Sequence, residues 1–427
     1  KIGMLHGNSM FANGGVKRLG IPELKMADGP LGVREEISRD NWSAAGWTND
    51  FATYYPASGA LAATWNTEMA YTFGNSVGQE LRARDKDMLL SPAINIVRTP
   101  LGGRTYEYMS EDPFLNKKIA VPLIIGLQNN DVMACVKHFA ANNQETNRDI
   151  YDVQMDERTL REIYLPAFKA AVTEANAYSI MGAYNKFRGD YLCENDYMLN
   201  TILRNEWGFK GVVVSDWAAV HSTVKTLKNG LDIEMGTPTT KFNEFFLADK
   251  LIAAAKAGEI SEAEIDKHVK RILGVLFQVK AMGTEQKNRV KGSIATEAHY
   301  QDAYKIASEA VAEQRAERRD EQRQRLAQAP AGLHAEAPGA FGTVEGLQLV
   351  TAPHHLGGAG QREQVAGVEV DEQHAGPRVE LQVAQRHEEE VAGEVGHEEG
   401  VLVLDLHEAG AAAAVRDIGA ATGRHVG

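Results

Sequence analysis

The stretch Gly211-Val-Val-Val-Ser-Asp-Trp217 decides the fold of this chain. Three β-branched residues follow a glycine and lead into a carboxylate and an aromatic ring. Such a short apolar run is typical of a strand buried in a parallel sheet. Five further runs of this kind occur in the first 290 residues. The predicted strands are residues 24–27, 88–91, 133–137, 179–183, 212–215 and 233–235.

Amphipathic stretches between these runs predict helices. The last of them begins with Ser261, which Glu262 and Glu264 follow, and this is the chemistry of a helix N-cap. Repeated strand–helix units indicate an α/β protein with a parallel sheet. At this length a closed (β/α)8 TIM-like barrel is the leading expectation, and a doubly wound sheet is the second. The predicted helices are residues 66–84, 113–130, 157–175, 196–207, 242–257 and 262–281.

The chain changes character near residue 308. The last Lys is Lys305 and the last Ser is Ser308, and residues 309–427 contain no Lys, Ser, Asn, Tyr, Trp, Met or Cys. This segment holds 10 Arg against 21 Asp and Glu, a net charge of -11, whereas all 427 residues together carry -13. The first 308 residues are therefore close to neutral.

Three segments follow from this change: a domain of residues 1–285, a linker of residues 286–308 and a low-complexity acidic tail of residues 309–427. Two interpretations of the tail stay open. Its weak packing capacity is typical of a partly disordered acidic extension. The joint loss of Lys, Asn, Tyr and Met is also typical of GC-rich DNA translated in a wrong frame, which would make the tail non-native.

Composition disfavours several classes of protein. Cys135 and Cys193 form no C-x-x-C pair and are too few for a disulfide scaffold. No apolar run reaches the roughly 18 residues of a membrane helix, and the acidic balance disfavours a nucleic-acid partner. No phosphate-binding glycine loop follows a strand, so no cofactor is expected. The chain begins at Lys1 without Met, and its natural N-terminus is expected to be missing.

Polar residues follow four of the predicted strands, at the point where each apolar run stops. They are Asp28, Lys137 with His138, Tyr184 and Asp216. In strand–helix barrels the working residues lie at the carboxyl ends of the strands. A strand that simply meets solvent is the alternative at any single end. Four ends rich in carboxylate and cation favour a functional site.

Asp216 and Trp217 form the most specific of these sequences. A rigid strand tip would hold the carboxylate, and the Trp217 ring offers a face that stacks on the C–H groups of a sugar. The alternative is that Asp216 caps the helix expected after it. No His-x-His or His-Glu-x-x-His spacing occurs in the predicted barrel, so no metal site is predicted and a metal-dependent hydrolase is disfavoured. The many donors of residues 98–113 and 140–148 fit a sugar better than a phosphate ester.

These segments resemble glycoside hydrolase family 3, the family of β-glucosidases and β-xylosidases, over about residues 1–285. The resemblance implies the N-terminal barrel domain of a retaining, exo-acting β-glycosidase that hydrolyses terminal non-reducing β-D-glycosyl residues. Asp216 matches the family's nucleophile and would form the covalent glycosyl intermediate, and nearby cations such as Lys137 and Arg148 would keep it ionised. The residues that would bind or frame the sugar are Asp28, Arg34, Arg104, Lys137, His138, Arg148, Met181 and Tyr184, with Trp217 beside the nucleophile.

Two departures from the family pattern matter. The loop of residues 139–150 contains no His, so the β-N-acetylglucosaminidase branch, whose acid/base unit lies there, is not expected. In the β-glucosidase branch the acid/base is a Glu of a second, α/β sandwich domain, which residues 309–427 do not resemble. Impaired activity is therefore expected for this chain. The alternatives are a non-catalytic or truncated sugar-binding barrel, and β-xylosidase specificity.

The expected partner is a small-molecule or oligosaccharide β-glycoside, without nucleic acid or membrane. The sequence indicates no particular oligomeric state. The family resemblance favours a periplasmic or secreted protein, and a cytoplasmic one is the alternative.

Overall fold

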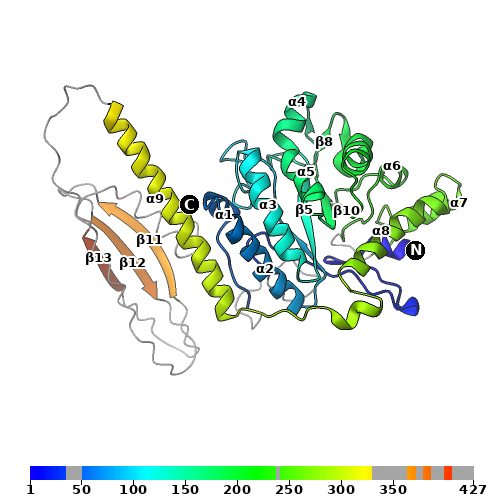
Figure 1. The fold of residues 1–427 in the computed structure, drawn as a ribbon, viewed down its shortest axis with the longest axis horizontal. Helices are drawn as coiled ribbons and strands as arrows, with labels where there is room; N and C mark the ends of the chain where they lie inside the picture. The colour runs from blue at the N-terminus through cyan, green and yellow to red at the C-terminus, as the bar shows by residue number, and fades with distance from the viewer. Residues whose placement is uncertain (35–50, 237–240, 329–362, 372–377, 386–398, 406–427) are drawn as a thin grey trace, which may run out of the picture. The chain divides into compact units, whose positions relative to one another are not determined.

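A computed structural model describes residues 1–34, 51–236 and 241–328, together with three strands after them. The chain divides into two compact units, Lys1–Leu333 and His334–Gly427, and each is described by itself. The first unit contains a parallel sheet with helices packed around it (Figure 1). Among the described residues, no helix has both the length and the apolar character needed to span a membrane.

Five parallel strands form the central sheet of the first unit, in the order β10-β7-β5-β4-β3. The middle strand, β5 (Met133–Phe139), is buried along its whole length. Five of the six predicted strands are therefore confirmed, and with them the α/β class with a parallel sheet. The other four strands are β3 (Met26–Asp28), β4 (Met88–Leu90), β7 (Ser179–Gly182) and β10 (Val212–Val214).

The sixth predicted strand, residues 233–235, is reduced to single bridges. Val214 pairs with Ile233 and His6 pairs with Glu234, both in parallel orientation. The described residues therefore contain fewer than the eight complete strand–helix units of a (β/α)8 barrel. The remaining strands of this unit are short pairs: β1 (Gly7–Ser9) with β2 (Ala12–Asn13), and β6 (Asp152–Val153) with β8 (Lys186–Phe187) and β9 (Asp190–Tyr191).

Helices alternate with the strands as the sequence predicts, and polar caps fix where they begin. α2 (Thr67–Ala83) starts after Asn66, whose side chain accepts two amide hydrogen bonds of the first turn. α3 (Pro113–Gln128) starts with proline at its first position, behind the capping Asp112. α8 (Glu262–Gln278) carries a capping box at its predicted start.

Two predicted helices differ from the structure. Residues 157–175 divide into α4 (Glu157–Thr159), the π-helical turn η3 (Leu160–Tyr164) and α5 (Pro166–Thr173). Pro166 lacks the amide hydrogen that an uninterrupted helix would need there. Residues 242–257 are helical only in α7 (Asp249–Lys256). Just before α7, the backbone amides of Phe246 and Leu247 donate to the Glu234 carboxylate instead of to helix carbonyls.

The predicted helix at residues 196–207 is present as the π-helical segment η5 (Tyr197–Glu206). Shorter helices occupy loops for which no helix was expected. They are α1 (Ser58–Ala63), α6 (Val224–Lys228), η1 (Ile2–Met4), η2 (Lys17–Leu19), η4 (Leu192–Glu194) and η6 (Thr284–Asn288).

Close packing of α2 against α3 covers one side of the sheet (Figure 1). A Cβ atom on Gly74 would lie 2.1 Å from the Leu123 carbonyl oxygen, and one on Gly126 would lie 2.3 Å from the Tyr71 carbonyl oxygen. Interiors packed to this density have no room for an added methyl group. Glycine at both positions is therefore a packing requirement.

Helix α9 (Glu297–Gln328) begins inside the segment of residues 286–308, which the sequence predicts as a linker. Its first turns are tied to α2. The Ser76 hydroxyl donates to Asp302 Oδ2 at 2.6 Å, and His299 Nδ1 lies 3.0 Å from the buried Glu80 Oε1. This part of the segment is thus packed into the first unit.

The second unit contains three described strands of one antiparallel sheet, in the order β11-β12-β13. They fall in the segment for which the sequence predicts a disordered or non-native tail, and that origin stays a prediction. The strands are β11 (Glu363–Asp371), β12 (Arg378–Gln385) and β13 (Glu399–Asp405).

Candidate functional site

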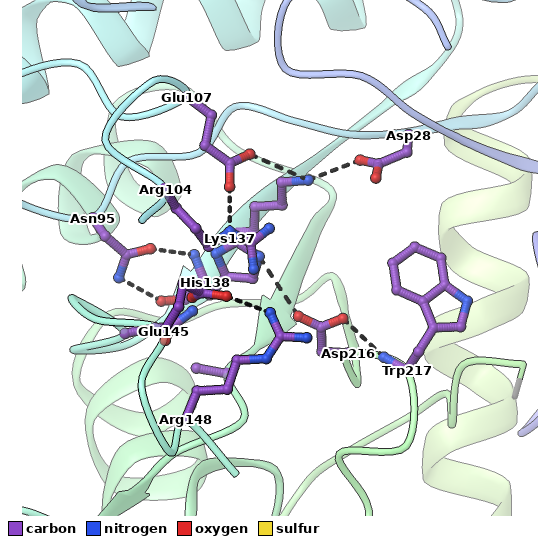
Figure 2. A network of polar contacts seen from close by, with 12 residues as sticks. Asp28, Asn95, Arg104, Glu107, Lys137, His138, Glu145, Arg148, Asp216 and Trp217 are labelled. Atoms are coloured by element: carbon purple, nitrogen blue, oxygen red, sulfur yellow. Dashed lines mark hydrogen bonds and ion pairs between the residues drawn. The ribbon is translucent and has the colours of Figure 1, made fainter. Parts of the chain in front are cut away.

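The polar residues predicted at the strand ends gather at one edge of the sheet. Asp28 is the last residue of β3, and Lys137 with His138 lies in the second half of β5. Tyr184 follows β7 by two residues, and Asp216 follows β10 by two. The strands are parallel members of one sheet, so their carboxyl ends lie along the same edge. Figure 2 shows the resulting network of polar contacts.

Lys137 is the buried cation at the centre of this network. Its side chain is only 2% exposed, and its Nζ lies 2.8 Å from Asp28 Oδ1 and 3.8 Å from Glu107 Oε2 (Figure 2). Desolvation lowers the pKa of Lys137, but attraction by the two carboxylates outweighs it and leaves the pKa above its ordinary value. Lys137 is therefore a permanent positive charge inside the site.

The same attraction acts on Asp28 in the opposite direction. Burial raises the pKa of its carboxyl, but Lys137 and, more weakly, Arg104 hold that pKa below the ordinary value. Both hydrogen bonds that Asp28 accepts within the described residues, from Lys137 Nζ and from the Gly29 amide, go to Oδ1. Its Oδ2 is thus left to accept a hydrogen bond from a ligand.

Glu107 completes the ion-pair network, and it is absent from the residues predicted for the site. Arg104 Nε donates to Glu107 Oε1, while the second carboxylate oxygen faces Lys137 (Figure 2). The sequence Gly-Gly-Arg104-Thr-Tyr-Glu107 held the signal for it, because Glu107 comes three residues after an arginine already assigned to the site.

Asp216 lies beside this network in a different electrostatic environment. Its side chain is 4% exposed, its Oδ1 accepts the Trp217 amide at 2.8 Å, and its Oδ2 lies 3.6 Å from His138 Nε2. Burial raises the pKa of Asp216 to about 6, against the lowering effects of Arg104 and of a hydrogen bond from Tyr184. Arg104 and Lys137 favour the ionised form, as expected of nearby cations, but desolvation outweighs their effect on the pKa.

His138 is a neutral ring at the centre of the site. Burial, followed by the positive charges of Arg104, Lys137 and Arg148, holds its pKa well below the ordinary value. Neither ring nitrogen has a hydrogen-bond partner within the described residues. Asn95 accepts from the His138 amide at 2.7 Å and donates to its carbonyl oxygen at 2.8 Å. The backbone is therefore fixed while the ring nitrogens remain open to a ligand.

Arg148 and Tyr184 close another side of the site. The Arg148 guanidinium lies 4.2 Å from the centroid of the Tyr184 ring, and its Nη1 donates to Glu145 (Figure 2). Burial and the neighbouring Asp216 carboxylate raise the pKa of the Tyr184 hydroxyl. Tyr184 therefore remains a neutral donor toward Asp216.

The aromatic residues Trp217 and Phe11 lie on a third side of the site. Trp217 Nε1 donates to the Met10 carbonyl oxygen at 2.8 Å, and the Trp217 ring packs edge-on against Phe11 with centroids 5.4 Å apart. Arg34 lies over the same Phe11 ring at 5.4 Å. Met181, also predicted for the site, is completely buried within β7.

The described residues contain no group of three or more His, Cys, Asp or Glu side chains arranged to hold a metal ion. Cys135 and Cys193 are free and buried. Burial raises the pKa of the Cys135 thiol to about 12, so it is not a thiolate at neutral pH.

Fold and site together define an α/β protein whose ionisable groups converge at the carboxyl edge of a parallel sheet. A model of the glycosyl hydrolase family 3 N-terminal domain matches residues 23–275, and the chain belongs to this family.

Curated relatives and solved structures of the same family resemble this chain. It is 46% identical over 321 residues to β-glucosidase BoGH3A of Bacteroides ovatus, covering 73% of this chain and 42% of the relative. It is 35% identical over 315 residues to an exo-α-(1→6)-L-arabinopyranosidase of Bifidobacterium longum, covering 73% of this chain and 40% of the relative. The glucose complex of β-glucosidase 3B from Thermotoga neapolitana matches with a TM-score of 0.66 at 36% identity, covering 72% of this chain and 45% of that one. The chain thus spans about two fifths of the length of these curated relatives.

Replacing Asp216 with Asn tests the effect of burial on this carboxylate. Burial moves the pKa of Asp216 from 3.8 to about 6, so the folded protein loses stability as the pH rises between these values. The Asp216→Asn variant does not lose stability in this way, because asparagine has no carboxyl group to ionise. We expect its free energy of unfolding to exceed that of the wild type by about 2–3 kcal/mol above pH 6, from roughly 1.4 kcal/mol per pKa unit, and by little below pH 4. Urea denaturation at several pH values measures the difference.

The matched control is Asp28→Asn, for which the opposite sign is expected. It removes a partner of the buried Lys137 and should lower stability at neutral pH. A stabilised Asp28→Asn variant, or an Asp216→Asn advantage that does not change with pH, would contradict this account of the site.

Proposed function

We propose that this chain carries the nucleophile and sugar-binding groups of an exo-acting, retaining β-glycosidase of the β-glucosidase type. One observation carries the proposal. The buried Asp216 carboxylate faces a neutral His138 and lies at an edge lined by the cations Lys137, Arg104 and Arg148. The names of several relatives, which are β-glucosidases, support the substrate class.

Asp216 would attack the anomeric carbon of a terminal β-D-glycosyl residue and form a covalent glycosyl–enzyme intermediate. With a pKa of about 6 it is largely ionised at pH 7 while remaining poorly solvated. The hydrogen bonds from Tyr184 and from the Trp217 amide would hold its orientation. A carboxylate poised in this way is both available and reactive.

Sugar hydroxyls would be held by the groups left open around Asp216. Asp28 Oδ2 can accept a hydroxyl hydrogen, and the Lys137 ammonium and Arg104 guanidinium can donate. His138 can bind through a ring nitrogen, and the Trp217 ring would stack on the sugar. Such contacts fix the reacting atoms in a productive geometry.

A retaining mechanism also needs a second carboxyl group, roughly 5–5.5 Å from the first, to protonate the leaving oxygen. In the part of the chain that the structure describes, the neighbouring carboxyl groups are committed elsewhere. Asp28 is held ionised by Lys137, and Glu107 is paired with Arg104 and Lys137. Glu145 is paired with Arg148. We therefore propose that this chain is impaired, because its described residues supply no free carboxyl group for acid/base assistance.

The barrel predicted from the sequence is proposed as the framework of this site. The single bridges from Val214 to Ile233 and from His6 to Glu234 support closure, because they continue the sheet beyond β10. The antiparallel bridge from Ala12 to Lys25 supports it from the other edge, next to β3. Together they support a ring of strands in which β2 runs antiparallel to both of its neighbours.

A mechanism-based inactivator tests the nucleophile. We expect a 2-deoxy-2-fluoro-β-D-glucoside with a good leaving group to add one sugar mass to the peptide containing Asp216. The inactivation rate should rise with pH, reach half of its maximum at about pH 6 and level off about one unit higher, because only the ionised carboxylate attacks. Mass spectrometry of the digested protein measures the label. Asp216→Asn should remain unlabelled, whereas Asp149→Asn, an exposed carboxylate near the site, should label normally.

The runner-up is a sugar-binding barrel without catalysis, which the commitment of Asp28 and Glu107 to ion pairs favours. Tight reversible binding of the same glycoside with no label at Asp216 would establish it. Labelling by a 2-fluoro xyloside in preference to the glucoside would instead assign β-xylosidase specificity.

Leaving-group dependence tests the missing acid. We expect this chain to hydrolyse cellobiose poorly or not at all, because general acid/base assistance is typically worth about 10²–10⁴-fold in rate. Dinitrophenyl β-glucoside should still be cleaved, since its leaving group needs little protonation. Steady-state kinetics on both substrates, with Asp216→Asn as the background, measure the contrast. Efficient cellobiose hydrolysis by the same chain would contradict this proposal.

A further inference from the structure

A strongly basic cavity lies on the helical layer of the first unit, between η5 and α8. Five cations line it: Arg204, Lys210, Lys267, Lys270 and Arg271. Its volume is about 780 Å³, within the range of roughly 300–1,000 Å³ that is usual for small-molecule sites. No Asp or Glu is among its lining residues.

One buried carboxylate, that of Asp232, offsets part of this positive charge. Asp232 Oδ2 lies 2.6 Å from Arg204 Nη2, and Asp232 Oδ1 lies 2.9 Å from Arg271 Nη1. Burial raises the pKa of Asp232, but attraction by these arginines outweighs it, so the carboxylate is ionised. Within the described residues, the three lysines form no ion pair. Asp232, which also contacts His268, offsets at most one of the five positive charges of the lining residues.

The spacing of the residues on α8 places these charges on one face. Lys267, Lys270, Arg271, Gly274 and Gln278 follow one another at intervals of three, one, three and four, and residues three or four apart are neighbours on a helix. Like charges at this spacing repel and lower helix stability. Glu264, three residues before Lys267, and Asp266, four residues before Lys270, offset part of this repulsion on the same helix.

Gly274 provides an independent observation. It lies in the interior of α8, where glycine is less stable than alanine. A Cβ atom at this position would meet no heavy atom within 4 Å in the described structure. Packing therefore does not require glycine here, in contrast to Gly74 and Gly126. The missing side chain leaves the helix backbone at this point open to the close approach of a ligand.

This cavity is separate from the site around Asp216. Lys210 precedes β10 and Asp216 follows it, so they lie at opposite ends of that strand. Six residues of extended chain span roughly 20 Å. A monosaccharide bound at Asp216 would not reach the cavity.

We propose that this cavity binds a small polyvalent oxyanion of the pyrophosphate type. The ammonium groups of Lys210, Lys267 and Lys270 and the guanidinium of Arg271 line it from the loop after η5 and from α8, and they match the several charged oxygens of such a ligand. The Arg204 guanidinium contributes charge, while its Nη groups donate to backbone carbonyls and to Asp232. The side-chain amides of Asn200 and Asn205 add donors at its rim. Its concave form and limited volume favour a small ligand over an extended polymer.

Calorimetric titration of the full chain with sodium pyrophosphate, at fixed ionic strength, tests the proposal. Fixed salt is needed because exposed charges are screened. We expect saturable binding at one site per chain, and tighter binding than that of orthophosphate. Lys210→Gln/Lys267→Gln/Lys270→Gln should weaken it by about tenfold or more, since each charge-assisted contact contributes on the order of a kcal/mol or more.

The control replaces three exposed lysines outside the cavity, Lys256→Gln/Lys287→Gln/Lys291→Gln, and changes the net charge equally. This variant should bind as the wild type does. The Gly274→Ala variant should bind pyrophosphate more weakly although its helix is more stable, which thermal unfolding would verify. Equal losses in both lysine variants, no saturable binding, or binding unaffected by Gly274→Ala would overturn the proposal. Labelling at Asp216 should be unchanged in every variant.

Discussion

The buried ammonium group of Lys137 is the constraint on which the rest of the site depends. An ion removed from water costs several kcal/mol unless it is paired with good geometry. Asp28, at the carboxyl end of β3, and Glu107, in the loop of Arg104, provide that pairing. The ion-pair network therefore joins β3, β5 and a long loop at one place. Movement of any of these segments would leave a buried charge uncompensated.

This network also explains why two carboxyl groups at the same edge behave differently. Lys137 contacts Asp28 directly and holds its pKa low, whereas burial dominates at Asp216 and raises its pKa to about 6. Pairs of titratable groups whose pKa values are pushed apart are typical of sites with divided roles. Asp28 is suited to hold a hydroxyl, and Asp216 is suited to react. The neutral His138, whose Nε2 lies 3.6 Å from Asp216 Oδ2, adds a donor or acceptor without adding charge.

Sequence patterns predicted the sheet and the strand-end residues, because parallel strands necessarily bring their carboxyl ends together. They did not predict Glu107 or Asn95, which lie on loops whose positions depend on packing far along the chain. Periodicity also predicted one helix at residues 157–175, where Pro166 interrupts it. The sequence identified the cations near Asp216, but only the folded structure reveals that burial outweighs their effect on the pKa of Asp216.

The most direct test of the central claim is a crystal structure of the Asp216→Asn variant with an intact β-glucoside bound. The account predicts the anomeric carbon about 3–3.5 Å from the side chain at position 216, the separation typical of a reactive geometry. It also predicts ring hydroxyls in contact with Asp28 Oδ2, Lys137 and a nitrogen of His138. A glucoside bound away from these groups, with the side chain at position 216 facing only protein, would contradict it.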